Sequence, residues 1–276
     1  MQGGCQGDHL LLNIVLLIIY KLNNVTQRMQ MNRIDIDKYM SDEAFDLIDE
    51  CREYLKGDIA ANISLLEAIR LGFGTVVYSD ENTLMIRNSG AESYMITTSS
   101  ADKCRELMKK VDTDYITVNN YEMAKVAGEF GYVVDDNCKQ VVYLYDETFD
   151  LGHDHDIRTL GYDEYYPLLK ETYHGLPDEA VVAHLKAGEV IGLFVDGTIV
   201  GYIGEHSEGS IGMLYVLPEH RMHGYAMILE NAMTEKKLRE GKIPFAQIIE
   251  TNAASLALQK RLGYEISKEF VLWMHN

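Results

Sequence analysis

The sequence predicts a mixed α/β fold in which helices cover both faces of a mixed sheet. Short apolar runs bounded by turn residues recur along the chain and are typical of strands. Between them lie segments with apolar residues at three- and four-residue spacing, which indicate amphipathic helices. The dipeptide Asp196-Gly197 between two apolar runs is a strong hairpin signal. With 276 residues, 47% of them hydrophobic, the chain is long enough for two modest domains.

The first half, residues 31–150, is expected to form a smaller α/β domain. A helical pattern with one apolar face covers residues 39–55, with Asp42 as a candidate cap at its start and Gly57 at its end. The elements expected after it are a helix at 59–71, strands at 75–78, 83–86 and 94–98, a helix at 100–111, a strand at 114–118, a helix at 121–130 and a strand at 140–145.

The short polar stretch 150–156, DLGHDHD, is the expected boundary between the two halves. His153 and His155 flank Asp154, a pattern that also suggests a metal site. No third ligand is evident, so a solvated linker is the favoured interpretation and no metal is expected.

The second half, residues 151–276, shows a regular alternation of strands and helices. A long amphipathic helix at 224–239 is its most prominent element. The other expected elements are a strand at 157–160, helices at 163–172 and 177–187, a hairpin of strands at 190–195 and 199–203, a strand at 210–216, a strand at 245–249, a helix at 255–262 and a strand at 270–274.

Residues 1–30 differ from the rest of the chain. The apolar run 10–20, LLLNIVLLIIY, is too short to span a bilayer as a helix, which takes about 20 residues. It also lacks the basic flank and the small-residue cleavage site of a signal peptide. Two readings stay open, a native segment or a non-native extension upstream of a start at Met29 or Met31.

Charge and cysteine usage exclude several classes of function. The formal net charge is −18, both halves are acidic and no Lys/Arg-rich run occurs, which argues against binding nucleic acid or an anionic membrane surface. An acidic protein suits a cationic or amine substrate. The four cysteines, Cys5, Cys51, Cys104 and Cys138, are far apart and form no CxxC pair, so we expect reduced thiols and a cytoplasmic location.

The stretch 209–224, GSIGMLYVLPEHRMHG, carries the clearest chemistry. An apolar strand stops at Pro218, a polar turn follows, and a helix begins after Gly224. Free backbone N–H groups at the mouth of a helix bind phosphate through their geometry and the helix dipole. Gly224 lets the backbone come close because it has no Cβ, Ala226 is small, and Arg221 adds a fixed positive charge.

The residues from Arg221 to Ala226, RMHGYA, fit the pattern R/Q-x-x-G-x-G/A, and in this the chain resembles the GNAT acyltransferases. Downstream, Asn252 opens a segment that runs to Leu262-Gly263-Tyr264 and is similar to a second signature of that family. The stretch 217–224 looks closest to the glycine N-acyltransferase-like branch. The resemblance covers residues 156–276 and implies a C-terminal GNAT fold, with the first half as a degenerate GNAT-like copy.

The resemblance implies a site for an acyl-CoA, most simply acetyl-CoA, as co-substrate. In the family, the strand that is 213–216 here separates from the one at 245–249, and the pantetheine arm lies in the gap. One backbone N–H would polarise the thioester carbonyl. The residues implied in binding the co-substrate are Leu214, Tyr215, Val216, Arg221, Met222, His223, Gly224, Tyr225, Ala226 and Asn252.

The sequence departs from the family pattern where catalysis is concerned. Many GNAT enzymes carry a tyrosine that acts as the acid, and Gln259 stands at that position here. Ser210 stands where the glycine N-acyltransferase branch has a glutamate. Transfer to an amine needs a group that takes the amine's proton. Glu205 and Glu250 are the candidate bases, and His206 and Glu208 lie near the same strand ends.

The expected function is transfer of an acetyl or other short acyl group from acyl-CoA to a small primary amine by direct attack. No Ser or Cys has an activating context, which argues against a covalent intermediate. Two alternatives stay open: a catalytically weak acyl-CoA-binding sensor or interaction module, and an acetyltransferase that acts on a protein N-terminus or lysine. A homodimer is also left open.

Overall fold

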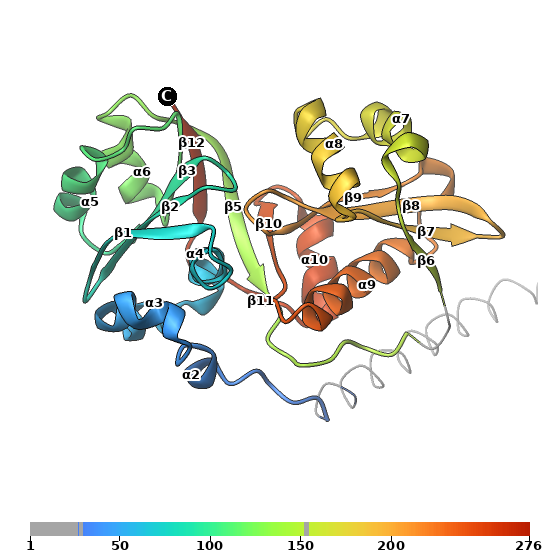
Figure 1. Ribbon diagram of the computed structural model, residues 1–276, viewed down its shortest axis with the longest axis horizontal. Helices are drawn as coiled ribbons and strands as arrows, with labels where there is room; N and C mark the ends of the chain where they lie inside the picture. Colours follow the sequence, from blue (N-terminus) through green and yellow to red (C-terminus); the bar gives the residue numbers. More distant parts are fainter. Residues whose placement is uncertain (1–26, 28–29, 152–154) are drawn as a thin grey trace, which may run out of the picture.

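The computed structural model describes Gln27, residues 30–151 and residues 155–276. The apolar run 10–20 and His153 lie outside the described residues. The described part is mixed α/β, as predicted, and its strands form one continuous twelve-stranded sheet (Figure 1). The strand order is β1-β2-β3-β4-β12-β5-β10-β9-β8-β7-β6, with β11 paired to β5.

The first half contributes the helices and strands from α2 to β5, and most lie close to their predicted positions. Their bounds are α2 Ile36–Tyr39, η1 Glu43–Cys51, α3 Arg52–Gly57, α4 Ile59–Arg70, β1 Gly74–Asp80, β2 Thr83–Asn88, β3 Ser93–Thr98, α5 Ala101–Met108, β4 Tyr115–Val118, α6 Tyr121–Gly128 and β5 Val133–Val142.

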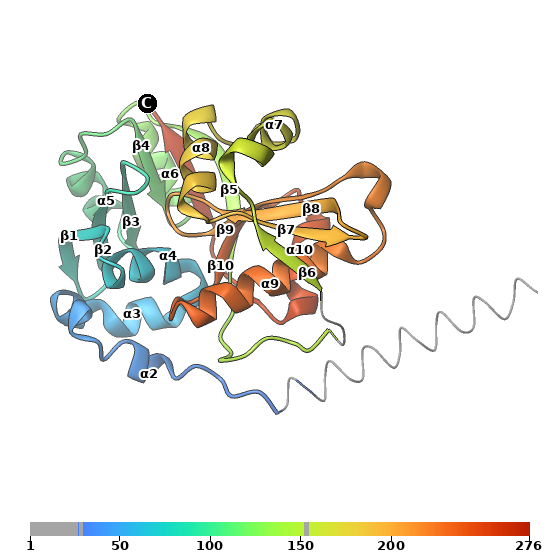
Figure 2. The ribbon, with the colours of Figure 1, turned by 45° about the vertical axis from the view of Figure 1, so that its right-hand side comes forward.

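The second half contributes β6 to β12. Helices α7 and α8 cover one face of its sheet, and α9 and α10 cover the other (Figures 1 and 2). The bounds are β6 Asp156–Thr159, α7 Tyr162–Thr172, α8 Asp178–Ala187, β7 Ile191–Val195, β8 Thr198–Glu205, β9 Ile211–Val216, η2 Pro218–His220, α9 Tyr225–Arg239, β10 Phe245–Ile249, α10 Ala253–Leu262, β11 Glu265–Ile266 and β12 Val271–His275.

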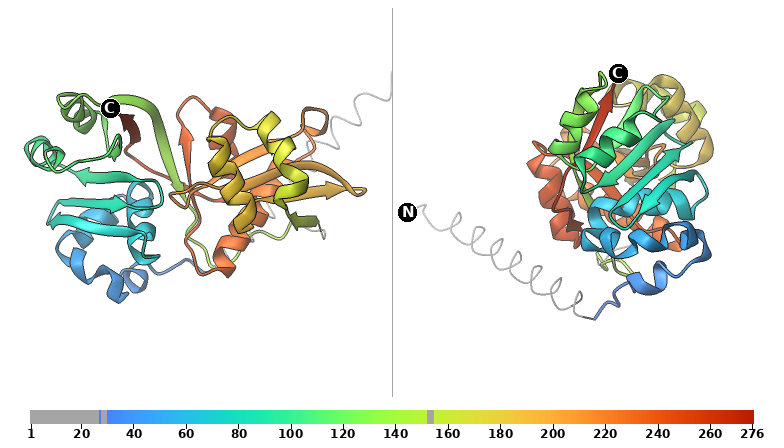
Figure 3. Two further views of the ribbon diagram at one scale, coloured as in Figure 1. Left: turned by 45° about the horizontal axis from the view of Figure 1, so that its top comes forward. Right: turned by 90° about the vertical axis from the view of Figure 1, so that its left-hand side faces the viewer.

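The two halves exchange strands. The last strand, β12, leaves the second half and lies between β4 and β5 of the first, antiparallel to both (Figure 3). In turn, β5 pairs with β10 from Phe245↔Val142 to Ile249↔Cys138. The two parts of the sheet are therefore joined by backbone hydrogen bonds.

Apolar cores fill both faces of the second half. On one face, Leu229 and Met233 of α9 pack with Val200, Ile211 and Ile248 from the sheet, all at most 5% exposed. On the other face, the core between the sheet and α7–α8 consists of Leu160, Leu169, Val181, Leu185, Val190, Phe194, Tyr202 and Met213. The strand β9 thus contributes side chains to both cores, which fixes it rigidly.

Three elements differ from the sequence-based expectation. The helical pattern at 39–55 is divided into α2, η1 and α3, with a non-helical residue at Ile48. Strand β5 begins at Val133 rather than 140, because its first four residues are exposed and two of them are aspartates, so they form no apolar run of strand length. The short strand β11 was not expected, since two residues are too few to form a pattern.

The described cysteines are single buried thiols. Burial raises the pKa of Cys51 and of Cys104 to about 11 and that of Cys138 to about 12. Thiols in such surroundings are poor nucleophiles at neutral pH. Among the helices within the described ranges, none is long and apolar enough to cross a membrane.

Candidate functional site

The mouth of α9 has the features of an anion site. Gly224, the residue before the helix, has φ +84°, a left-handed conformation that favours glycine. The first N–H groups bonded back to the chain are those of Met227 and Ile228, both to the Gly224 carbonyl. Within the described part of the chain, no group accepts from the N–H groups of Gly224, Tyr225 and Ala226. No side chain caps this helix, so its first turn is left open to an external acceptor.

The strand that leads to this mouth carries a β-bulge. Met213 and Leu214 of β9 lie opposite the single residue Ile203 of β8, between the pairs Tyr202↔Tyr215 and Gly204↔Gly212. Met213 has φ +53° although it is not glycine, and it is 2% exposed. Bulges interrupt the hydrogen bonding of a strand and redirect its backbone groups. The sequence contained no signal for this bulge.

Strand β9 also separates from β10. The two run parallel and share a single residue pair, Ile211 with Ala246, at the start of both. Beyond it, β10 follows β5 over five pairs, whereas β9 continues along β8 to Val216. The separation runs from Ile211 towards the mouth of α9, as the GNAT resemblance implied for this segment.

The polar turn before α9 holds its basic and aromatic residues at the end of β9. The Arg221 Nε donates to the Val216 carbonyl at 3.0 Å, and the guanidinium carbon lies 5.5 Å from the centre of the Tyr215 ring. His223 and Tyr225 are stacked, with ring centres 5.6 Å apart. Met222 is fully exposed with φ +66°. Arg221 is therefore held beside the open N–H groups of α9.

Asn252 and Gln259 lie at the start and on the inner face of α10. Asn252 is exposed and its Oδ1 accepts from the Ser255 N–H at 3.1 Å, so the side chain caps the helix. Contact with a co-substrate would use its remaining amide N–H groups. Gln259 is 2% exposed and its Oε1 has no hydrogen-bond partner within the described ranges. It packs beside the buried Glu230 of α9.

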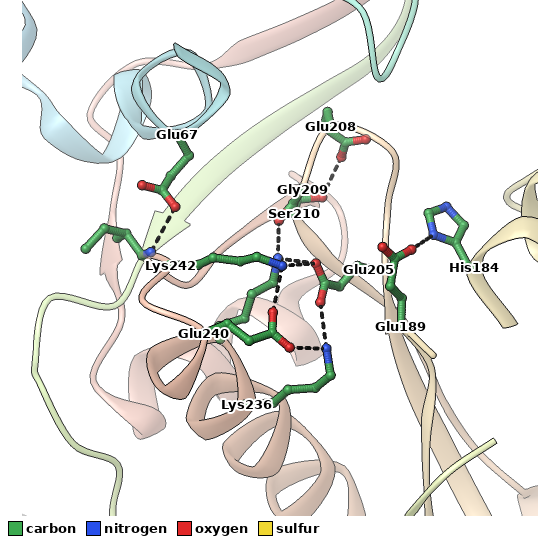
Figure 4. Close-up of polar contacts among 12 residues, drawn as sticks. Glu67, His184, Glu189, Glu205, Glu208, Gly209, Ser210, Lys236, Glu240 and Lys242 are labelled. Carbon is green, nitrogen blue, oxygen red and sulfur yellow. Dashed lines mark hydrogen bonds and ion pairs between the residues drawn. The ribbon is translucent and has the colours of Figure 1, made fainter. Parts of the chain in front are cut away.

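The geometry argues against Glu205 as a base. Its carboxylate is 4% exposed and lies 3.3 Å from Lys236 Nζ, 2.5 Å from Lys237 Nζ and 3.7 Å from Lys242 Nζ (Figure 4). A buried carboxylate that is enclosed by three ion pairs is not placed to contact a substrate amine. Glu205 thus joins β8 to α9 and to the loop after it, and we assign it a structural role.

Glu250 lies at the end of β10, on the side that faces β5. It is exposed, its Oε2 accepts from Asn137 Nδ2 at 2.9 Å, and its N–H donates to the Asn137 carbonyl. Asn137 Nδ2 also donates to the Tyr121 hydroxyl of α6 at 2.7 Å. Glu250 therefore stays a base candidate on position alone, with contacts that connect it to the first half.

A chain of polar side chains lies at the other end of β9. The Tyr173 hydroxyl is 3.0 Å from His206 Nε2, His206 Nδ1 is 3.5 Å from Glu208 Oε1, and Ser210 Oγ donates to Glu208 Oε1 at 2.5 Å. Burial raises the pKa of Tyr173 to about 12, and the Glu208 charge adds to the effect. Burial opposes ionisation of Glu208 as well, but the hydrogen bond and charge of His206 lower its pKa.

Sequence reasoning placed His206 and Glu208 near this region but missed Tyr173, which follows α7 and is 33 residues away. The Glu208 carboxylate is bonded to Ser210, the residue that stands where a glutamate was expected. Glu208, in the turn before β9, thus places a carboxylate beside the Ser210 position. A Glu two residues before an unexpected Ser was the signal that could have been used.

The turn that carries His206 and Glu208 is held from several sides. From α8, the His184 Nε2 lies 3.5 Å from Ser207 Oγ, and its Nδ1 is 2.7 Å from Glu189 Oε2. From α9, the Lys237 Nζ donates to the Gly209 carbonyl at 2.7 Å. Such supports keep functional groups in one geometry.

Comparisons with known proteins give one family match and several similar folds. Residues 190–273, less than half of the chain, match the FR47-like protein family, and the match includes β9, the motif 221–226 and Asn252. No curated protein matches the chain in sequence. An X-ray structure of a Drosophila protein superimposes with a TM-score of 0.53 at 20% identity, over 70% of this chain and 73% of that one. This likeness concerns the fold alone.

Other similar structures are GNAT acetyltransferases. A GCN5-related N-acetyltransferase from Kribbella flavida has a TM-score of 0.49 at 14% identity, over 79% of this chain and 95% of its own. An acetyltransferase of the GNAT family from Colwellia psychrerythraea has a TM-score of 0.48 at 11% identity, over 81% and 97%. With TM-scores below 0.5, neither carries a conclusion about this chain.

No group of three or more His, Cys, Asp or Glu side chains within the described ranges is arranged to hold a metal ion. Of the two histidines in the linker, only His155 belongs to the described residues, and His153 lies outside them.

Proposed function

We propose that this protein transfers an acyl group, most simply acetyl, from acyl-CoA to a primary amine. The observation that carries the proposal is the mouth of α9, where a left-handed Gly224 leaves a turn of unbonded N–H groups at the end of a strand separating from its neighbour. The match to the FR47-like family over this segment supports it.

Each part of the site has a role in this reaction. The N–H groups of α9 and the Arg221 guanidinium bind the pyrophosphate. The pantetheine arm lies along β9, against the backbone of Leu214, Tyr215 and Val216. An N–H at the bulge polarises the thioester carbonyl. The amine attacks directly, because the described thiols are buried and have raised pKa values. We expect this in the cytoplasm, where thiols stay reduced.

A single methyl group tests the proposal. In Gly224→Ala the new Cβ meets no atom within 4 Å, so the protein has room for it. A left-handed alanine costs about 1–2 kcal/mol, and its methyl group would take up space that the phosphates need in the proposed site. We expect CoA affinity to fall at least about tenfold, equivalent to about 1.4 kcal/mol, as measured by titration calorimetry.

Gly197→Ala is the matched control. Gly197 has φ +78°, its Cβ also meets nothing within 4 Å, and it lies in the turn between β7 and β8. Both variants should lose the same stability in urea, while only Gly224→Ala loses CoA affinity. Equal CoA affinity in the two variants would refute the phosphate site.

The second candidate function is an acyl-CoA-binding module with weak or no catalysis. The burial of Gln259, at the position of the family's acid, favours it. Release of CoA thiol from acetyl-CoA in the presence of a panel of primary amines separates the two. Binding without thiol release for every amine would support the module. A lysine peptide in the panel tests action on proteins.

A further inference from the structure

We propose that Tyr173, His206 and Glu208 form the relay that takes the proton from the attacking amine. The inference rests on the proposed function and names the group that the sequence left unassigned. Three observations carry it: the order in which the three side chains contact one another, their place at the closed end of the separation between β9 and β10, and their position on the α7–α8 face of β9.

The first step concerns distance along β9. The strands β9 and β10 are paired at Ile211 and diverge towards Val216 and the mouth of α9. The five steps from Ile211 to Val216 span about 16 Å at about 3.3 Å per residue. The pantetheine arm carries two amides in an extended chain of comparable length. An acyl-CoA held by its pyrophosphate at α9 therefore places its thioester in the first part of β9, between Ile211 and the bulge at Met213 and Leu214.

The second step places the relay beside that point. A Cβ on Gly212 would collide with the His206 imidazole, so the ring lies directly against the β9 backbone one residue before the bulge. Glycine is required here because any side chain would displace the imidazole. The relay and the expected position of the thioester are thus about one to two residues apart along the strand.

The third step concerns the face of the sheet. Met213 and Tyr215 pack towards α7 and α8, whereas Ile211 and Leu214 pack towards α9. Tyr173 follows α7, so the relay lies on the α7–α8 face. The acyl-CoA enters at the mouth of α9, which leaves the α7–α8 face for the amine. The His206 side chain is 27% exposed there, while that of Glu208 is 9% exposed.

The hydrogen bonds define the direction of proton transfer. Glu208 is charged and accepts from His206 Nδ1, so Nε2 carries the lone pair and accepts from the Tyr173 hydroxyl. With its raised pKa, the Tyr173 hydroxyl keeps its proton at neutral pH. It can accept a proton only if it passes its own to His206, and Glu208 stabilises the resulting imidazolium. Tyr173 is the catalytic residue, and His206 and Glu208 act through it.

The step is balanced as follows. The amine nitrogen forms a bond to the thioester carbon, and the C–S bond breaks with its electron pair leaving on the CoA sulfur. The amine proton passes to Tyr173 Oη while the Tyr173 proton moves to His206 Nε2. The CoA thiolate takes a proton from water, and the imidazolium returns its proton to water through the hydroxyl.

Kinetics with acetyl-CoA test the relay, using the best amine among glycine, tyramine, spermidine and a lysine peptide. We expect Tyr173→Phe and His206→Gln each to lower kcat about 10²–10⁴-fold, with CoA affinity unchanged. The double variant should be no slower than either single one, because the two residues act as a unit. Tyr202→Phe is the matched control, since its buried hydroxyl bonds Thr172 and not His206.

Removing the charge of Glu208 gives a second readout. The groups facing His206 are Tyr173 from the end of α7 and Glu208 within the turn, with Cys138 of β5 beyond Glu208. Glu208→Gln keeps the size of the side chain and removes the charge that stabilises the imidazolium, so kcat should fall while the KM for acetyl-CoA and the CoA affinity stay unchanged. Glu208→Asp keeps the charge and should restore part of kcat.

The outcomes separate the two proposals. A wild-type protein that turns over while Tyr173→Phe or His206→Gln keeps the parent kcat refutes the relay and leaves the acyltransferase standing. A wild-type protein that binds CoA without turnover refutes the acyltransferase. That result would refute the relay as well, since no proton would then be taken from an amine.

Discussion

A single carboxyl group, Glu230, is buried without a charged partner. It is 2% exposed, its Oε1 has no hydrogen-bond partner within the described ranges, and it lies between α9 and α10. Burial raises the pKa of Glu230 to about 7, and the neighbouring Gln259 offsets only part of this effect. The folded protein therefore keeps a neutral acid in its core at mildly acidic pH.

Glu230→Gln should stabilise the protein in a pH-dependent way. The folded pKa of about 7 lies above the ordinary value of 4.5. The contribution of Glu230 to the free energy of unfolding is therefore fully present below pH 4.5. It declines as pH rises to about 7, because the carboxyl group loses its proton first in the unfolded chain. Glu230→Gln has no carboxyl group to ionise, so its free energy of unfolding should exceed that of the parent protein by about 3 kcal/mol above pH 7. Urea denaturation from pH 5 to 8 measures it.

Glu235→Gln is the control for this series. Its side chain is 53% exposed on the same helix, and its stability difference from the parent should not change with pH. A constant difference for Glu230→Gln as well would show that Glu230 is ionised in the folded state.

At this scale the sequence indicated the residues of the proposed phosphate site and not those of the proposed relay. Arg221 and Gly224 lie five and eight residues after the end of β9 at Val216, so a local pattern contains the whole proposed phosphate site. Tyr173 and His206 meet only through the packing of α7 against the sheet. No local pattern records that contact.

Helix α9 connects the proposed phosphate site to the ionic cluster around Glu205 at its other end. Its first turn offers the unbonded N–H groups, and its last turns place Lys236 and Lys237 on Glu205 of β8. Lys237 is itself 2% exposed, and burial lowers its pKa. A buried charged pair is costly to break from one side, because the remaining charge loses its partner.

Glu205→Gln should therefore destabilise the protein by about 3–5 kcal/mol without changing the rate of acyl transfer of the folded protein. Glu240→Gln is the comparison, since Glu240 bonds Lys236 and Lys242 with its side chain 34% exposed. Its loss should stay near 1 kcal/mol or below. Urea midpoints and thiol release measured in the absence of urea check both. A folded Glu205→Gln that binds CoA and releases no thiol would identify Glu205 as the base.

Elements with strong periodicity were predicted within a few residues, and those without it were not. Helix α4 and strand β10 match their patterns because each buries an apolar face. Strand β5 begins seven residues before the predicted start, since Val133 to Asp136 are exposed and held only by pairing with β12. The bulge at Met213 has no sequence signal because it arises from the pairing of β9 with β8.

The whole molecule is organised around the exchanged strands. The chain order predicts two successive α/β halves, and the positions of most elements agree with that order. The exchange itself depends on which strands pair, which hydrophobic patterns do not specify. Because β5 pairs with β10 on the side away from β9, the first half holds the strand that borders the separation of β9 and β10. In the described contacts, the first half supports the strands of the proposed site.

The exchange makes the second half dependent on the first. In a fragment 155–276, β10 loses its partner β5 over five pairs, and β12 loses both β4 and β5. These strands would expose unpaired backbone groups and apolar side chains such as Leu272 and Met274, which are at most 1% exposed in the whole chain. We expect the fragment to aggregate or to lack a cooperative thermal transition by circular dichroism, and to bind no CoA. Co-expression with fragment 1–151 should restore both properties, since the strand pairs can form between two chains. A fragment 155–276 that melts cooperatively as a monomer and binds CoA would show that the second half is an independent domain and that the pairing with β5 is dispensable.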